Sequence, residues 1–181
     1  MSAEIVVGLT PHQAELLADT RSGVDQAFHL ICFVGGVGAG KTRGAALKAY
    51  QLASLNPGCV GMVIMPTIDM LESIIIREML TLFEEWRFVE GQDYVYEKRR
   101  KQITINCPDG RRSKILFRPS LDHRRLVGQN LAWALIDEAE DNPEDAFTEM
   151  TKRIRHPSAH VKQLVCMGTP ESLGGRFEPG G

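Results

Sequence analysis

The sequence predicts an α/β fold with a mostly parallel sheet flanked by helices. Short runs of apolar, strand-forming residues recur along the chain, and segments of helical composition separate them. Strands that alternate with helices form parallel sheets, because each helix returns the chain across one face. The 181 residues, 43% of them hydrophobic, are enough for one domain with a sizeable core. We therefore expect a single α/β domain over residues 1–181.

The first half of the chain is expected to hold a short helix and two strand–helix units. Thr10 and Pro11 form an N-cap and first-turn pair, which predicts a helix there. Residues 29–34 form a fully apolar run, and residues 41–55 have helical composition. Residues 60–66 predict a second buried strand, followed by a long helix from Thr67 to about residue 86.

The second half departs from this alternation and then returns to it. Residues 101–119 form two strand-like runs around a Pro-Asp-Gly turn, which predicts an inserted β-hairpin. Residues 131–136 predict a strand, after which Asn142 is expected to cap a helix that reaches residue 155. An apolar run at residues 161–172 predicts the last strand.

Charge and composition limit the possible functions. The net charge is -2, so there is no global cationic field for nucleic acid, and any such contact must be a local patch. No apolar run approaches the roughly 18 residues of a membrane span, so we expect no membrane contact. The four cysteines are widely spaced and are expected to be reduced residues in or near the core, without a metal or disulfide role.

A glycine-rich segment between a predicted strand and a predicted helix fits G-x-x-x-x-G-K-[ST]. Glycines let the backbone curl so that successive N–H groups point at phosphate oxygens, and the helix adds its positive N-terminal end. Lysine supplies a charge for the β and γ phosphates, and the threonine hydroxyl can bind Mg²⁺. The predicted nucleotide-binding residues are Gly35, Gly36, Val37, Gly38, Ala39, Gly40, Lys41 and Thr42.

A second candidate stretch, ALIDEAE, places Asp137 and Glu138 after an apolar strand. Ligands of open α/β sheets bind at this carboxyl end of the strands. Asp137 is expected to hold Mg²⁺, and Glu138 is expected to polarise the water that attacks the γ phosphate. The alternative is an acidic helix start that only complements the helix dipole.

The last predicted strand ends in Gly168, Thr169 and Pro170. Thr169 is a candidate sensor of the γ phosphate that passes this state to a neighbouring segment. A simple strand-ending turn remains the alternative for these three residues.

Together these motifs resemble the ATPase domain of the large terminase subunit, the DNA-packaging motor of tailed bacteriophages. GGVGAGKT is similar to the Walker A motif of that family, ALIDEAE to its Walker B motif with the catalytic glutamate, and GTP to its coupling motif. LTPHQ, residues 9–13, resembles its adenine-reading segment, in which Gln13 would contact the base. The resemblance implies a P-loop NTPase fold of the ASCE/RecA-like type and spans about residues 9–171.

The resemblance also implies a function and partners. It predicts an enzyme that couples Mg-ATP hydrolysis to the translocation of double-stranded DNA into the procapsid, with weak DNA binding by this domain alone. A homo-oligomeric ring on a portal protein and a small terminase subunit are the implied partners. The host cytoplasm, and transiently the procapsid portal, is the implied location. Since few carboxylates follow the last strand, we expect no C-terminal nuclease domain in this chain and no DNA cleavage.

Two basic segments have open assignments. The family uses an arginine upstream of Walker B that acts on the nucleotide of a neighbouring subunit, and Arg124 and Arg125 are the candidates. The alternative is that both arginines contact DNA or solvent. Residues 97–101, with Arg111, Arg112 and Lys114 across the hairpin turn, form either a patch for DNA phosphates or a solvated hairpin edge.

Two other functions compete with the motor hypothesis. One is a helicase-like translocase, which normally needs a second motor domain. The other is a non-mechanical, nucleotide-dependent assembly switch. Glu138 argues against the switch, because a switch that need not hydrolyse has little use for a water-orienting carboxylate.

Overall fold

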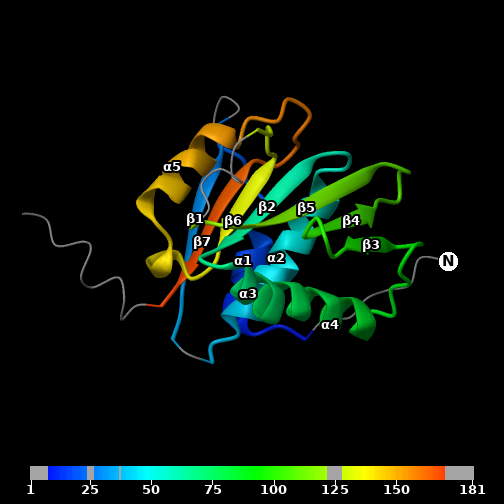
Figure 1. Cartoon of the computed structure of the whole chain (residues 1–181), viewed down its shortest axis with the longest axis horizontal. Coiled ribbons are helices and arrows are strands. Elements are labelled where there is room, and N and C mark those ends of the chain that lie inside the picture. The colour runs from blue at the N-terminus through cyan, green and yellow to red at the C-terminus, as the bar shows by residue number, and fades with distance from the viewer. Residues whose placement is uncertain (1–7, 24–26, 37, 122–127, 170–181) are drawn as a thin grey trace, which may run out of the picture.

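The computed structural model describes residues 8–23, 27–36, 38–121 and 128–169 (Figure 1). Its centre is a seven-stranded sheet with the order β1-β7-β6-β2-β5-β4-β3. Five neighbouring strands, from β1 to β5 in that order, are parallel, and β4 and β3 continue the sheet antiparallel. The strands are β1 (His29–Val34), β2 (Val60–Met65), β3 (Tyr94–Glu97), β4 (Gln102–Asn106), β5 (Arg112–Pro119), β6 (Trp133–Ile136) and β7 (Gln163–Gly168).

Helices cover both faces of the sheet, as the sequence predicted (Figure 1). One face packs against α1 (Pro11–Ala18), α2 (Lys41–Leu55) and α4 (Arg77–Glu85) through a large apolar cluster that includes Leu52, Phe83 and Trp133. The other face packs against α5 (Glu144–Arg153) through a smaller cluster around Ala146 and Met150.

The helix starts follow from local side-chain chemistry. Thr10 and Gln13 form a reciprocal capping box at the start of α1. The Thr67 hydroxyl accepts a hydrogen bond from the backbone N–H of Met70 at the start of α3 (Ile68–Met70). The chain continues from α3 through a π-helical stretch, Leu71–Ile76, into α4, so the single long helix that the sequence predicted contains a π segment.

One close contact joins β2 to β6. Gly61 on β2 lies opposite Trp133 on β6, and the Trp133 indole covers the Gly61 backbone. A Cβ at position 61 would lie 2.0 Å from the nearest indole atom, so no side chain fits there. This contact lets a fully buried tryptophan lie between the sheet and the helices.

Three sequence expectations need correction. The predicted hairpin exists as β4 and β5, but β5 also pairs parallel with β2, and β3 adds a third antiparallel strand that the sequence did not predict. Asn142 does not cap α5, whose N-cap position is Pro143. Cys32 is exposed on the edge strand β1, although Cys59 and Cys107 are buried free thiols as expected.

Candidate active site

The phosphate-loop segment connects β1 to α2 at the carboxyl edge of the parallel strands. Gly38 and Gly40 have φ angles of 78° and 73°, in the left-handed region that favours glycine. The loop is tied to the neighbouring strand, because the Gly35 N–H donates to the Gly168 carbonyl at 3.1 Å. The described part of the loop therefore has the backbone curvature that the motif requires.

Lys41 and Thr42 begin α2 directly after this loop. The Lys41 ammonium donates to the carbonyl oxygens of Gly35 at 2.7 Å and Gly36 at 3.1 Å, so it lies against the loop itself. Thr42 is half-buried in the first turn of the helix. Both side chains occupy the positions that the motif assigned to them relative to strand and helix.

Asp137 follows β6 and is 2% exposed. One carboxylate oxygen, Oδ1, accepts a hydrogen bond from the Glu138 N–H at 3.0 Å, and Oδ2 is buried without a partner among the described residues. Burial raises the pKa of Asp137 to about 6, and the nearby Glu138 carboxylate adds to the shift while Lys41 opposes it. A cation beside Oδ2 would compensate this buried acid.

Glu138 adopts a left-handed backbone conformation with φ 50°. Such a conformation is strained for a residue with a long side chain, and strained residues gather at functional sites. Asn142 holds the turn by donating from Nδ2 to the carbonyl oxygens of Asp137 at 2.8 Å and Glu138 at 2.7 Å. Burial raises the pKa of Glu138, and the carboxylate of Glu140 raises it further.

The residues present fit Mg²⁺ and a nucleotide phosphate. The Asp137 carboxylate and the Thr42 hydroxyl are oxygen ligands of the kind that Mg²⁺ prefers. Across the described ranges, no three His, Cys, Asp or Glu side chains converge as a metal cage. Magnesium with one or two protein ligands, completed by phosphate oxygens and water, fits this sparse set.

Gln13 contacts the phosphate loop directly. Its side chain is 3% exposed, with Oε1 accepting from the Thr10 N–H at 3.0 Å and Nε2 donating to the Gly40 carbonyl at 2.9 Å. The sequence did not predict this loop contact. A contact between Gln13 and an adenine base stays a prediction.

Four predicted site residues lie outside the described residues: Val37, Arg124, Arg125 and Pro170. The two described residues of the predicted coupling segment, Gly168 and Thr169, lie beside the phosphate loop and the acidic turn. The Thr169 N–H donates to Oε1 of Glu140 at 3.0 Å. No local sequence pattern points to Glu140, because its contact depends on the register between β6 and β7.

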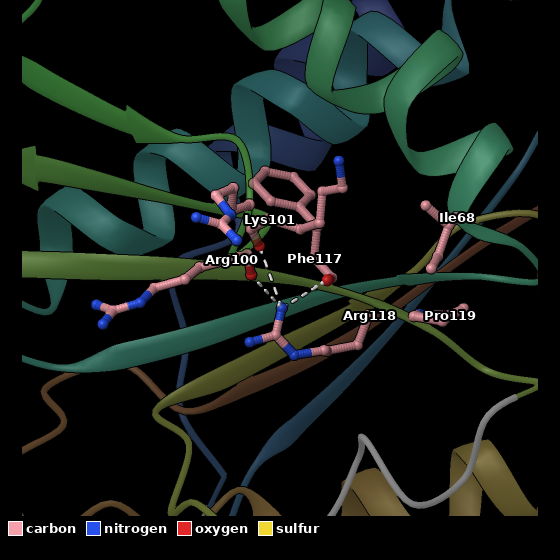
Figure 2. A pocket seen from close by; sticks show the side chains of 7 residues that line it. Ile68, Arg100, Lys101, Phe117, Arg118 and Pro119 are labelled. Carbon is pink, nitrogen blue, oxygen red and sulfur yellow. Dashed lines mark hydrogen bonds between the residues drawn. The ribbon is translucent and has the colours of Figure 1, made fainter.

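A basic cavity of about 240 Å³ lies further along the same edge of the sheet (Figure 2). Arg118, near the end of β5, reaches back to the turn between β3 and β4 and donates to the carbonyl oxygens of Arg100 and Lys101. Lys101 has φ 48° and pairs with Glu72. The lining residues are Ile68, Arg99, Arg100, Lys101, Phe117, Arg118 and Pro119.

This cavity changes the predicted basic patch. Arg112 pairs with Asn106 at the far end of β4, whereas Gln102, beside the basic turn, pairs with Leu116. Arg111 and Arg112 therefore lie at the opposite end of the hairpin from residues 97–101, and Lys114 lies midway, opposite Thr104, so the basic residues are spread along the hairpin. Arg118 lines the cavity, whereas Arg111 and Arg112 do not, and no local sequence signal points to Arg118.

Comparison with solved structures identifies the fold. The large terminase of a thermophilic bacteriophage superposes with a TM-score of 0.73 at 17% identity, covering 90% of this chain and 39% of that one. The large terminase ATPase domain of Thermus phage P74-26 gives 0.57 at 18% identity, covering 83% of this chain and 63% of that one. The chain has the fold of a large terminase ATPase domain.

The terminase fold extends to other phages. The HK97 large terminase matches with a TM-score of 0.64 at 14% identity, covering 90% of this chain and 33% of its own length. No family model and no curated protein matches the sequence. The chain spans about two fifths of the large terminase from the thermophilic bacteriophage. Among the helices of the described residues, none has the length and hydrophobicity to cross a membrane.

Proposed function

We propose that this chain is an ATP-hydrolysing motor domain that drives double-stranded DNA in the manner of a phage large terminase. The arrangement at the carboxyl edge of the sheet carries the proposal. A phosphate loop with Lys41 and Thr42 follows β1, and the paired acids Asp137 and Glu138 follow β6, with only β7 between them. The fold supports it, since the large terminase of the thermophilic bacteriophage is also known in complex with ADP and with ATP-γ-S.

Each residue has a role in this proposal. The loop, residues 35–40, binds the phosphates through backbone N–H groups, and Lys41 exchanges its loop carbonyls for phosphate oxygens. Thr42 and Asp137 hold Mg²⁺, which neutralises charge that develops on the phosphates. Gln13 orders the loop through Gly40 and contacts the adenine base.

Glu138 is the proposed catalytic base. Its raised pKa suits a group that accepts a proton from the attacking water, and the strained turn held by Asn142 fixes its position. Gly168, Thr169 and Pro170 form the coupling segment. Arg124 or Arg125 of a neighbouring subunit completes the site by stabilising the transferring phosphate.

The partners follow from the motor hypothesis. DNA phosphates contact the basic cavity, whose Arg99 and Arg100 side chains are exposed. With a net charge of -2, binding by this domain alone is weak. The proposed partners are further copies of this chain, in a ring on a portal protein, and a small terminase subunit. The proposed location is the host cytoplasm, and transiently the procapsid portal.

Nucleotide-binding measurements on three proteins test the site. Lys41→Ala should bind Mg-ATP at least about tenfold more weakly than wild type, because a phosphate loses its cationic partner. Glu138→Gln should bind as tightly as wild type, since that residue acts on water. Equal affinity in all three proteins would place the nucleotide elsewhere.

Turnover per subunit should rise with protein concentration, because a monomer lacks the arginine of its neighbour. Arg125→Ala should remove that rise, with Arg124→Ala as the matched comparison. A rate per subunit that stays flat in wild type would count against an arginine supplied in trans and favour the nucleotide-dependent switch.

A further inference from the structure

Glu140 is a buried acid two residues after Glu138, in a short 3₁₀ turn, Ala139–Asp141. It is 7% exposed. Oε1 accepts the hydrogen bond from the Thr169 N–H at 3.0 Å, while Oε2 is buried without a partner among the described residues. The side chain thus joins the acidic turn after β6 to the chain leaving β7.

Gly168 fits closely against this carboxylate. A Cβ at position 168 would lie 2.6 Å from Oε2 of Glu140, so any side chain there would displace the acid. The Gly168 carbonyl also accepts the hydrogen bond from the Gly35 N–H at the start of the phosphate loop. One peptide segment, residues 168–169, therefore contacts both halves of the candidate active site.

Stability alone does not account for a carboxylate at this position. A buried acid with one hydrogen bond leaves an oxygen unsatisfied, and this costs free energy that a neutral side chain would avoid. A hydrogen bond from a backbone N–H to an ionised carboxylate is, however, stronger and shorter than one between neutral groups. Such a bond suits a contact that must fix a segment in position.

We propose that Glu140 is a positioning residue that couples the acidic turn to the segment leaving β7. Its carboxylate holds the Thr169 backbone in a fixed relation to Glu138, and Gly168 extends this link to the phosphate loop. A displacement of the turn during hydrolysis is thereby transmitted to Gly168 and Thr169. This inference rests on the proposed ATPase function.

Kinetics of three variants test the coupling. Glu140→Ala should lower kcat at least about tenfold with KM within about twofold of wild type, the loss expected for one charge-assisted hydrogen bond. Glu140→Gln, which retains an acceptor oxygen, should recover part of that loss. Asp141→Asn, an exposed acid on the same turn, is the matched control and should hydrolyse ATP as wild type does.

Amide hydrogen exchange at Thr169, followed by NMR, tests the contact without relying on activity. The amide should be protected in wild type and Asp141→Asn, and should lose protection at least about tenfold in Glu140→Ala. An unprotected amide in wild type overturns the inference. If wild type hydrolyses no ATP while this protection pattern holds, the proposed function fails and the Glu140 link stands.

Two kinetic outcomes also overturn the inference. One is a Glu140→Ala protein that hydrolyses ATP at the wild-type rate. The other is a loss of kcat, nucleotide affinity and melting temperature that is equal in the Ala and Gln variants, since a merely structural role would produce that result.

Discussion

The acids after β6 combine burial, strain and repulsion within four residues. Asp137 is buried with one oxygen that has no partner among the described residues, and Glu138 has a left-handed backbone. Burial, and then the Glu140 carboxylate, raise the pKa of Glu138. Each feature costs free energy in the isolated protein. A cation and phosphates bound between this turn and Lys41 would offset the electrostatic part of that cost.

Because of Asp137, the free energy of unfolding should fall as pH rises, which is the opposite of the usual effect of a carboxylate. Its pKa rises from 3.8 in the unfolded chain to about 6 in the folded protein. The folded state therefore binds more protons between these values, and this residue lowers the free energy of unfolding as pH rises from about 4 to 6. The stabilisation by protonated Asp137 is present below about pH 4 and lost above about pH 6.

Asp137→Asn should therefore be more stable than wild type at pH 7 to 8, by up to about 3 kcal/mol, and should match it near pH 4. Urea denaturation across this pH range measures the difference. Magnesium with ATP should stabilise wild type at pH 7 more than Asp137→Asn, because the variant keeps Lys41 and Thr42 but loses a carboxylate ligand of the metal. A constant stability difference at every pH would show that the carboxyl titrates normally.

Local spacing was sufficient to predict where Lys41, Thr42, Asp137 and Glu138 lie in the fold, and their roles stay predictions. Each lies next to a strand end or a helix start that its own neighbours determine. Glu140 and Arg118 were not predictable, because their contacts depend on strand register between β6 and β7 and on the return of β5 beside the β3–β4 turn.

At the scale of helices and strands, packing of β2 against β6 positions the acidic turn. Gly61 and Trp133 are paired, and the Asp137 N–H donates to the carbonyl of Ile64 at 2.9 Å. The indole fills the space above Gly61, so this contact stabilises the strand that delivers Asp137.

Gly61→Ala should destabilise the protein by about 2 kcal/mol or more, because the added methyl group cannot fit beside the indole. Chemical denaturation measures the change. Gly8→Ala, where a Cβ meets nothing within 4 Å, is the control and should be nearly neutral. Wild-type stability in Gly61→Ala would mean that Trp133 moves readily away from β2.

The strand–helix alternation was predicted correctly because apolar runs and helix stops are local signals. The third antiparallel strand, β3, was missed because residues 94–97 have mixed polarity and only pairing with β4 shows them to be a strand. Asn142 was misread as a cap, since its side chain bonds backward to the acidic turn.

Over the whole molecule, the basic cavity and the candidate ATP site share one edge of the sheet. Ile64 pairs with both Ile136 and Arg118, so Arg118 lies level with the residue before Asp137. Two strand spacings separate their backbones, roughly 10 Å. DNA bound at the cavity would therefore lie close enough to the acidic turn to be displaced when that turn moves.

Charge reversal at Arg99 and Arg100 should weaken binding of duplex DNA, because exposed cations that contact phosphates are lost. The slope of log affinity against log salt should become shallower by about 0.9 for each contact removed, with little dependence on sequence. Fluorescence anisotropy of labelled duplex DNA over a salt series measures this slope.

Reversal of Arg111 and Arg112 is the matched control, because both are exposed at the other end of the hairpin. Those changes should leave the slope unaltered. Equal effects from the two pairs would show that DNA responds to net charge and not to the cavity.

The rate of Mg²⁺-dependent ATP hydrolysis by wild type and Glu138→Gln, measured side by side at a protein concentration that permits subunit contact, is the most direct test of the motor hypothesis. We expect wild type to hydrolyse ATP and Glu138→Gln to be at least about a hundredfold slower with unchanged nucleotide affinity, because only the attacking water loses its base. Equal rates in the two proteins would contradict the assignment of this acidic turn as the centre of hydrolysis.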